Sequence, residues 1–261
     1  MTKPNIITIS NLTKKFGRRT VLRDISLQIN RGDSVAFTGR NGSGKSTLLK
    51  IIAGLLPFEA GSVTHSGRLK FAYVPERFPA MNLTARDYIM QIGLVSGLKK
   101  DEISERSTEL FRSLFMHDMI DTPIRYLSKG TIQKMAVVQA FITTPDVLLL
   151  DEPISGQDVA SQQVFMEMAN RLSRAGVTVL CSCHEEYMVK AIARYVYEIA
   201  DGKLCPVEQA RAQDAGTCRL LFVKDGQEVV LDVAARDCDR VISEMLRDNF
   251  SFRGLNNERI L

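Results

Sequence analysis

Apolar and polar residues alternate along two segments near the N-terminus, residues 6–12 and 21–29, which is typical of half-buried strands. Two unbroken apolar runs, residues 35–37 and 147–150, instead predict strands buried on both faces. After the second run, strands and helices alternate, as they do in a parallel sheet covered by helices. Further strands are predicted at 62–65, 70–74, 177–181 and 195–199, and helices at 48–52, 132–142, 159–174 and 187–193.

Between residues 83 and 115 the apolar residues recur with the spacing of a helix. This pattern predicts an all-helical insert of about fifty residues. Thr84 and Asp101 are the candidate N-caps of its first two helices. Beyond the hairpin signal Asp201-Gly202 the chain changes character. Two strand patterns flank Asp225-Gly226, and a helical pattern follows at 238–246. We therefore predict a small ββα unit for residues 206–261.

The composition is that of an ordinary globular protein, with 45% apolar and 25% charged residues among 261. A net charge of +4 without a Lys/Arg block does not favour a nucleic-acid partner. The five cysteines lack zinc-ligand spacing and are interpreted as reduced thiols of a cytosolic protein. The polar N-terminus predicts no signal peptide, and 18 consecutive apolar residues occur nowhere, so any membrane role is expected to depend on a partner.

A glycine-rich loop follows the buried strand at 35–37 and precedes a helix. It matches the phosphate-loop pattern G-x-x-x-x-G-K-[ST], in which backbone N–H groups and the helix dipole face an anion. Lys45 is expected to reach the β- and γ-phosphates of a nucleoside triphosphate, and the Ser46 hydroxyl to bind Mg²⁺. The predicted loop residues are Gly39, Arg40, Asn41, Gly42, Ser43, Gly44, Lys45, Ser46 and Thr47.

Two adjacent carboxylates, Asp151 and Glu152, end the apolar run at 147–150. A buried strand delivers them to the carboxyl edge of the sheet, where ligands of such sheets bind. Asp151 is expected to hold Mg²⁺, and Glu152 to polarise the attacking water as a general base.

A second anion site is predicted where Ser128 and Gly130 introduce a helix. One nucleotide does not need two phosphate sites in one chain. Two chains arranged head to tail would use both, with the loop of one chain facing the Ser/Gly helix start of the other.

Taken together, residues 6 to 204 resemble the ATP-binding cassette (ABC) ATPases in motif content and order. The resemblance implies an α/β P-loop NTPase core with an antiparallel β subdomain (residues 1–205) and an inserted helical subdomain at about 80–143. It further implies that Phe16 stacks on adenine, that Ser128 and Gly130 contact the γ-phosphate across a dimer, and that His184 is the switch histidine. Residues 155–158 occupy the place of the loop that links the two sites of the dimer.

Four positions depart from the family pattern, and one of them is Thr131, which stands where the family usually has a glutamine. Glu76 stands where the family has a Mg²⁺-binding glutamine, and a carboxylate can still bind this hard cation. Lys129 replaces the commoner second glycine of the signature, and Gln157 replaces an apolar residue. We expect altered coupling at Glu76, and no loss of activity, because Glu152 and His184 are intact.

The resemblance implies a hydrolytic subunit that uses ATP and Mg²⁺ and powers a separate transmembrane subunit, as half of a homo- or heterodimer on the cytoplasmic face of the membrane. The Lys-containing signature is similar to that of bacterial drug- and antibiotic-export cassettes, which favours export over import. Two alternatives are a cassette acting on ribosomes or nucleic acid, and a non-hydrolysing regulatory cassette. The ββα unit is interpreted as a packing extension, with a dimer contact or a regulatory role as its alternative.

Overall fold

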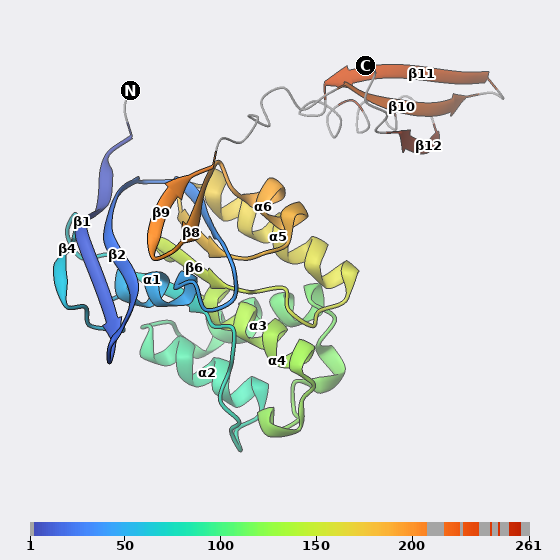
Figure 1. Ribbon diagram of the computed structural model, residues 1–261. Coiled ribbons are helices and arrows are strands. Elements are labelled where there is room, and N and C mark those ends of the chain that lie inside the picture. Colours follow the sequence, from blue (N-terminus) through green and yellow to red (C-terminus); the bar gives the residue numbers. More distant parts are fainter. Residues whose placement is uncertain are drawn as a thin grey trace. The chain divides into compact units, whose positions relative to one another are not determined.

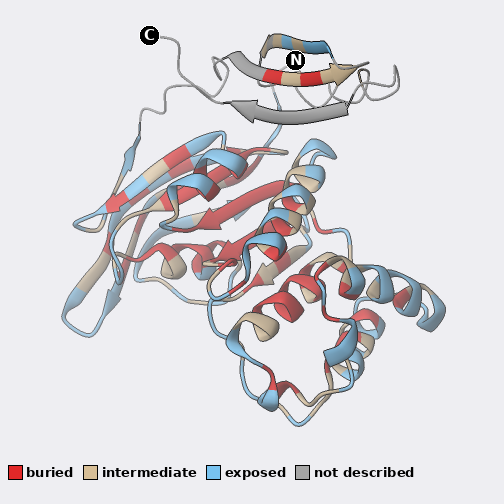
Figure 2. Ribbon diagram, turned by 90° about the vertical axis from the view of Figure 1, so that its right-hand side faces the viewer, coloured by how far each residue is buried: buried red, intermediate tan, exposed pale blue. Residues whose placement is uncertain are grey.

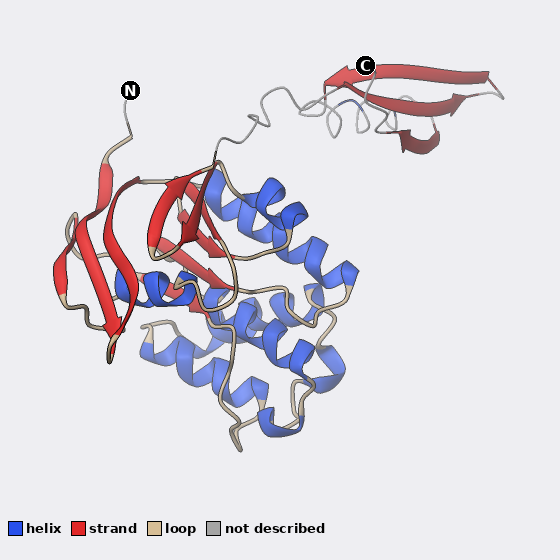
Figure 3. Ribbon diagram, viewed as in Figure 1, coloured by secondary structure: helices blue, strands red, loops and turns tan. Residues whose placement is uncertain are grey.

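A six-stranded sheet forms the centre of the unit Met1–Glu208 (Figures 1 and 3). The computed structural model describes residues 3–207, 217–224, 227–234, 241, 245 and 251–256. Five neighbouring strands of the sheet are parallel, and the edge strand β9 is antiparallel to β8. In order across the sheet the strands are β5 (Phe71–Val74), β6 (Val147–Asp151), β7 (Thr178–Ser182), β3 (Ser34–Thr38), β8 (Tyr195–Ala200) and β9 (Lys203–Pro206).

The predicted buried runs line both faces of this sheet, and Figure 2 shows the buried central strands. Along β6, Val147 and Leu149 belong to one apolar cluster, whereas Leu148 and Leu150 belong to the other. This alternation follows from the two-residue period of a strand. Helix α1 (Lys45–Ile52) covers the first face, and α5 (Val159–Arg174) and α6 (Glu186–Ile192) contribute to the second cluster.

A separate antiparallel sheet packs with α1 into the first cluster. Its order is β2 (Arg19–Asn30), β1 (Asn5–Phe16) and β4 (Ala60–His65). The predicted strands at 6–12 and 21–29 are confirmed, but both extend further to a hairpin that ends beside Phe16. The α/β class with an antiparallel β subdomain is thereby confirmed.

The helical insert contains α2 (Ala85–Val95), α3 (Lys100–Ser113) and α4 (Lys129–Phe141), with short 3₁₀ turns at His117–Met119 and Ile124–Tyr126. Thr84 caps α2 as predicted, because its side chain accepts a hydrogen bond from the Asp87 N–H. The predicted Asp101 cap is wrong. The α3 helix begins at Lys100, so Asp101 lies inside the first turn, where its charge complements the helix dipole.

The chain divides into two compact units, Met1–Glu208 and Gln209–Leu261. The predicted hairpin of the second unit is present as β10 (Thr217–Lys224) and β11 (Gln227–Ala234), with Leu220 and Phe222 in its core. Most of the predicted helix at 238–246, and the Asp225-Gly226 turn, lie outside the described residues.

The ββα prediction missed a third strand, β12 (Ser251–Asn256), which pairs with β10. The register passes from Phe252 to Gly254 opposite consecutive residues of β10, so Arg253 is an extra residue in the ladder. Such a bulge interrupts the two-residue period on which strand prediction depends.

Candidate functional site

The glycine-rich loop joins β3 to α1 at the carboxyl edge of the central sheet. Gly39, Gly42 and Gly44 all have positive φ angles, of 129°, 76° and 113°. A Cβ atom on Gly39 would lie 2.6 Å from the Ile199 carbonyl oxygen, so only glycine fits there. Gly44 is the N-cap of α1 and supplies no capping side chain, which leaves the first N–H groups of the helix free to bind an anion.

Lys45 is held at the centre of the loop and is only 6% exposed. Its ammonium donates a hydrogen bond to the Gly39 carbonyl oxygen at 2.9 Å and lies 3.8 Å from Glu152 Oε1. A buried cation needs such partners, and a phosphate could take the place of these oxygens. The lysine is therefore positioned before any nucleotide binds.

Three hydroxyl groups converge on the Asp151 carboxylate at the end of β6. Ser46 and Ser182 donate to Asp151 Oδ1 at 2.7 and 2.9 Å, and Tyr73 donates to Oδ2 at 2.8 Å. Burial, and then the charge of Asp151, raise the pKa of the Tyr73 phenol well above its usual value. Tyr73 thus remains a donor throughout the physiological pH range.

Glu152 adopts a left-handed conformation with φ of 49°, which is strained for a residue with a side chain. Burial raises the pKa of its carboxyl, and the charges of His184 and Lys45 only partly offset this. The two ring nitrogens of His184 lie 2.9 Å from Glu152 Oε2 and 3.4 Å from Glu185 Oε1. A ligand atom from each of these three residues lies within 4.8 Å of the others, so the cluster could also hold a cation.

A cavity of about 640 Å³ collects most of the predicted site residues, including Phe16, Ser46 and Glu76. Its size is that of an ordinary small-molecule pocket. Phe16 is 51% exposed, and the Lys14 ammonium lies 5.0 Å from the centre of its ring. The other predicted residues lining the cavity are Asn41, Gly42, Gly44, Lys45, Thr47, Glu152 and His184.

Some predicted residues lie elsewhere. Arg40 and Ser43 line a second cavity of about 600 Å³, on the side of the loop toward the β8–β9 hairpin. Ser128 and Gly130 do not line the first cavity but lie at the start of α4. There Ser128 is the N-cap and accepts a hydrogen bond from the Thr131 N–H at 3.2 Å.

Several residues of the site are not among those predicted from the sequence. Ser182 and Tyr73 bind Asp151, while Arg19 and Arg77 line the first cavity beside the predicted residues. Ser182 had a usable signal, because it ends the strand next to Asp151 and so lies at the same sheet edge. The hydrogen bonds of Tyr73 depended on strand register, which its sequence context does not reveal.

Helix α4 is hydrogen-bonded to the segment that carries Glu76. Gln133 donates to the Pro75 carbonyl oxygen at 3.1 Å, and Gln139 donates to that of Tyr73 at 3.3 Å. Glu76 itself is 47% exposed at its side chain and lies 3.8 Å from the Arg77 guanidinium.

A sequence profile described as ABC transporter matches residues 22–155, which include the loop, Ser128 and the Asp151-Glu152 pair. NatA, an ABC transporter ATP-binding protein of Bacillus subtilis, is 31% identical over 76% of this chain and 87% of its own length. The zinc import ATP-binding protein ZnuC of Yersinia pestis is 32% identical over 72% of this chain and 73% of its own. An uncharacterised ABC transporter ATP-binding protein of Methanocaldococcus jannaschii is 29% identical over 96% and 95% of the two chains.

Two solved structures share the fold at 23% identity. An ATP-binding subunit of an ABC transporter aligns with a TM-score of 0.70 over 92% of this chain and 99% of its own. A dimeric post-hydrolysis state of an ATP-binding cassette, bound to ADP and phosphate, aligns with a TM-score of 0.71 over 79% and 99%. These likenesses confirm the P-loop NTPase fold.

In the described part of the chain, no helix combines the length and the apolar composition that crossing a membrane requires. The comparisons give no support to the alternative of a cassette acting on ribosomes or nucleic acid. The profile match and the NatA relationship, together with the loop and carboxylates gathered at one sheet edge, show that this chain belongs to the ABC transporter family as an ATP-binding and ATP-hydrolysing subunit.

Proposed function

We propose that ATP binds in the cavity beside the glycine-rich loop and is hydrolysed there by water that Glu152 activates. The observation that carries this proposal is the convergence of five side chains at one sheet edge. Ser46 hydrogen-bonds to Asp151, and Lys45 and His184 both contact Glu152. A phosphate held by the loop would therefore lie beside a carboxylate whose raised pKa makes it a stronger base than an ordinary glutamate.

Each side chain has a distinct role in this proposal. Phe16, half exposed on the cavity wall, stacks on the adenine, and such stacking contributes about 1–3 kcal/mol. Lys45 exchanges its carbonyl contacts for the β- and γ-phosphate oxygens. Glu152 takes a proton from the water while the water oxygen attacks the γ-phosphorus and ADP departs. His184 turns from Glu152 to the γ-phosphate.

Magnesium fits the donors present, because Ser46, Asp151 and Glu76 offer the oxygen ligands that this hard cation prefers. When bound there, Mg²⁺ would supply positive charge that offsets the negative charge of the phosphates. The carboxylate at Glu76 adds a negative charge to this set. Glu76→Gln is expected to shift the Mg²⁺ dependence of ATP turnover, and an unchanged Mg²⁺ dependence and rate would contradict the role of Glu76.

A Glu152→Gln variant tests the central proposal, since the amide keeps the shape of the side chain and loses the base. We expect ATP binding to persist while turnover falls by about 100-fold or more, the range typical of a lost general base. Glu186→Gln, on the exposed side of α6, is the matched control and should leave turnover unchanged. Full turnover in Glu152→Gln would overturn the proposal. In a heterodimer it would mean that the partner cassette hydrolyses the ATP and that this chain is the regulatory one.

The chain is further proposed to pair head to tail with a second cassette and to drive a separate membrane-spanning subunit, from a peripheral position on the cytoplasmic face. The dimer proposal is supported by Ser128 and Gly130, which lie outside the chain's own nucleotide cavity and are available to a facing one. Co-purification with a hydrophobic multi-span protein tests the membrane partner. Recovery without such a protein from detergent-solubilised native membranes would contradict it.

For the direction of transport we propose export, on the basis of Lys129 in the signature. The relatives named as zinc import proteins have the opposite direction, so the proposal needs a direct test. Inside-out membrane vesicles containing the chain and its membrane partner should accumulate substrate when ATP is added outside. Substrate release from these vesicles would indicate import.

A further inference from the structure

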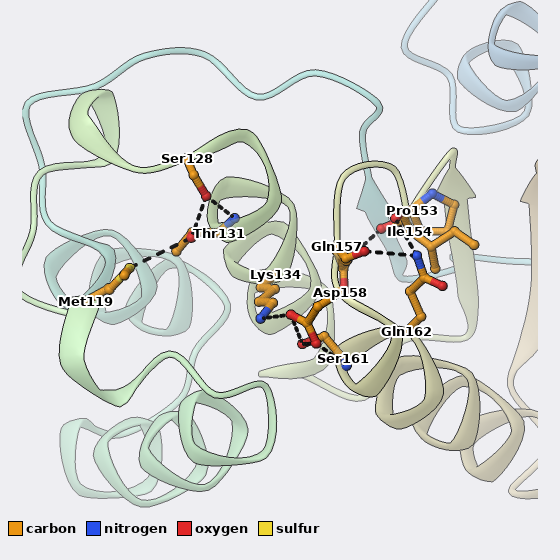
Figure 4. A network of polar contacts seen from close by, with 10 residues as sticks. All are labelled: Met119, Ser128, Thr131, Lys134, Pro153, Ile154, Gln157, Asp158, Ser161 and Gln162. Carbon is orange, nitrogen blue, oxygen red and sulfur yellow. Dashed lines mark hydrogen bonds and ion pairs between the residues drawn. The ribbon is translucent and has the colours of Figure 1, made fainter.

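The segment from Pro153 to Asp158, which follows Glu152, is fixed to the first half of α4 by two lysines. Lys129 donates to Ser155 Oγ at 2.9 Å, and Lys134 donates to Asp158 Oδ2 at 2.7 Å. Figure 4 shows the second contact, with Asp158 also bound to Ser161. The hydrogen bond from Lys134 is the largest of the effects that hold the pKa of Asp158 well below its usual value, so the Asp158 carboxylate stays ionised at neutral pH.

Between these two contacts the backbones of α4 and the segment touch. A Cβ atom on Gly130 would lie 2.2 Å from the Gly156 carbonyl oxygen, so a larger residue would separate them. The aliphatic stem of Lys129 passes over Gly156, with its Cδ and Cγ atoms 3.7 and 3.8 Å from the position that a Cβ on Gly156 would take. Lys129 therefore contacts the segment along its stem and through its ammonium.

The segment is also hydrogen-bonded to the backbone of Glu152, the residue that precedes it. The Ser155 N–H donates to the Glu152 carbonyl oxygen at 3.3 Å, and the Gln157 side chain donates to the Pro153 carbonyl oxygen at 2.8 Å. The left-handed backbone of Glu152 persists only where its surroundings fix it. Ser155 also lines the nucleotide cavity, so a displacement of this segment changes the cavity wall beside Glu152.

We propose that Lys129 is a positioning residue, which couples the start of α4 to Glu152 of the same chain through Ser155. The inference rests on the proposed roles of Glu152 and of Ser128 and Gly130. In the head-to-tail dimer, the start of α4 faces the partner's nucleotide, while Glu152 faces the chain's own. Lys129 then joins the two sites within one chain, which a glycine at position 129 could not do because it lacks a side-chain donor.

Three variants of the full chain test this coupling by steady-state ATP turnover: Lys129→Met, Ser155→Ala and the double variant. Each single variant removes one hydrogen bond to a charged donor, and we expect kcat to fall about 3- to 10-fold. The KM for ATP should stay within about twofold, and the double variant should be no slower than the slower single variant, because both remove one shared interaction.

Two further variants separate positioning from a general effect of charge. Lys129→Arg keeps a donor on a long stem, so it should retain most of the kcat. Lys190→Met, the matched control, removes an exposed lysine that is paired with Glu186 at 2.7 Å on α6, and it should leave kcat and KM unchanged. Thermal unfolding of each variant identifies any loss of turnover that comes from unfolding.

Independent losses at Lys129 and Ser155 that multiply in the double variant would overturn the coupling. A raised KM in Lys129→Met alone would show instead that Lys129 contacts the partner's ATP, and an unchanged kcat would show that the hydrogen bond has no role in turnover. These results are distinguishable from a failure of the proposed function. That failure is reported by Glu152→Gln, whatever the pair at 129 and 155 does.

Discussion

At the scale of single residues, the site depends on hydroxyl groups that hold a buried carboxylate. Asp151 is 1% exposed and accepts hydrogen bonds from Ser46, Ser182 and Tyr73, which come from three different elements. An ionised carboxylate in such a position requires several donors, because burial without them would be costly. The same donors fix the orientation of the carboxylate toward the loop.

Replacing Tyr73 by Phe removes the donor to Asp151 Oδ2 and leaves that buried oxygen with less hydrogen bonding. We expect the free energy of unfolding to fall by about 1–3 kcal/mol, measured by urea denaturation without nucleotide or Mg²⁺. Tyr195→Phe, at an exposed tyrosine, is the matched control. Equal stability of the two variants would contradict the importance of this hydrogen bond.

Asp146 predicts a pH dependence of stability. A hydrogen bond from the Lys70 N–H, and then one from the Arg31 side chain, lower the pKa of Asp146. Folding therefore favours the ionised form, so this stabilisation is complete above the unfolded pKa of about 4 and is lost as the pH falls through the folded pKa.

Asp146→Asn should therefore destabilise the protein most at neutral pH, by about 1 kcal/mol. Its thermal midpoint should approach that of the unaltered chain below about pH 4. Asp118→Asn, at an exposed position, provides the control at each pH. A difference that stays constant between pH 7 and pH 3 would show that ionisation of Asp146 is not its cause.

At the scale of elements, α4 connects more of the site than any motif indicated. Ser128 and Gly130 lie at its start. Gln133 donates a hydrogen bond to the segment that carries Glu76, and Lys134 donates one to Asp158. These contacts come from different faces of the helix, which explains why so many of its residues are buried, including Gln133 and Lys134. A shift of α4 must therefore move either the Glu76 segment or the loop after Glu152.

Gly130→Ala tests the close contact between α4 and residue 156. Alanine normally stabilises a helix by about 1 kcal/mol relative to glycine. Here its Cβ would lie 2.2 Å from the Gly156 carbonyl oxygen, so we expect a net loss of about 1–3 kcal/mol in thermal unfolding, with reduced ATP turnover.

Gly93→Ala in α2 is the comparison for this variant. The added Cβ would lie 2.5 Å from the Ile103 side chain, which can move away by changing its rotamer. The Cβ added at position 130 would instead meet the backbone of Gly156, which has no such freedom. The loss of stability should therefore be smaller at position 93. A more stable Gly130→Ala variant would contradict the close packing at Gly156.

At the scale of the whole molecule, the nucleotide cavity and the start of α4 are separate surfaces of one cassette. If they form complete sites only between two chains, dilution should reduce turnover per chain. We expect the rate to rise with the square of the protein concentration at low concentration. A strictly linear dependence, in a sample shown to be monomeric by light scattering, would contradict the dimer.

The division at Glu208 predicts that the cassette folds without the second unit. The first unit has two apolar clusters of its own, and the second unit has one, with Leu220 and Phe222 at its centre. A chain of residues 1–208 should keep its thermal midpoint and its turnover at saturating protein concentration. If half-maximal turnover required more protein than for the full chain, the second unit would be a dimer contact and more than a packing extension.

Much of the fold follows from local patterns in the sequence. The runs at 35–37 and 147–150 identify buried strands, since few other segments have unbroken apolar residues next to glycines or carboxylates. The helix at Val159–Arg174 also has the predicted bounds, because Asp158 caps it and an apolar face follows. The strand β12 was missed because its bulge hides the period.

The sequence by itself determined the family, the phosphate loop and the order of most elements, because these depend on residues close together in the chain. Only the tertiary structure decided which distant side chains meet. Tyr73 and Ser182 reach Asp151 through strand register, and Lys129 reaches Ser155 through the packing of α4. Such contacts join residues 26 to 78 positions apart, and their distances depend on how the whole sheet and its helices pack.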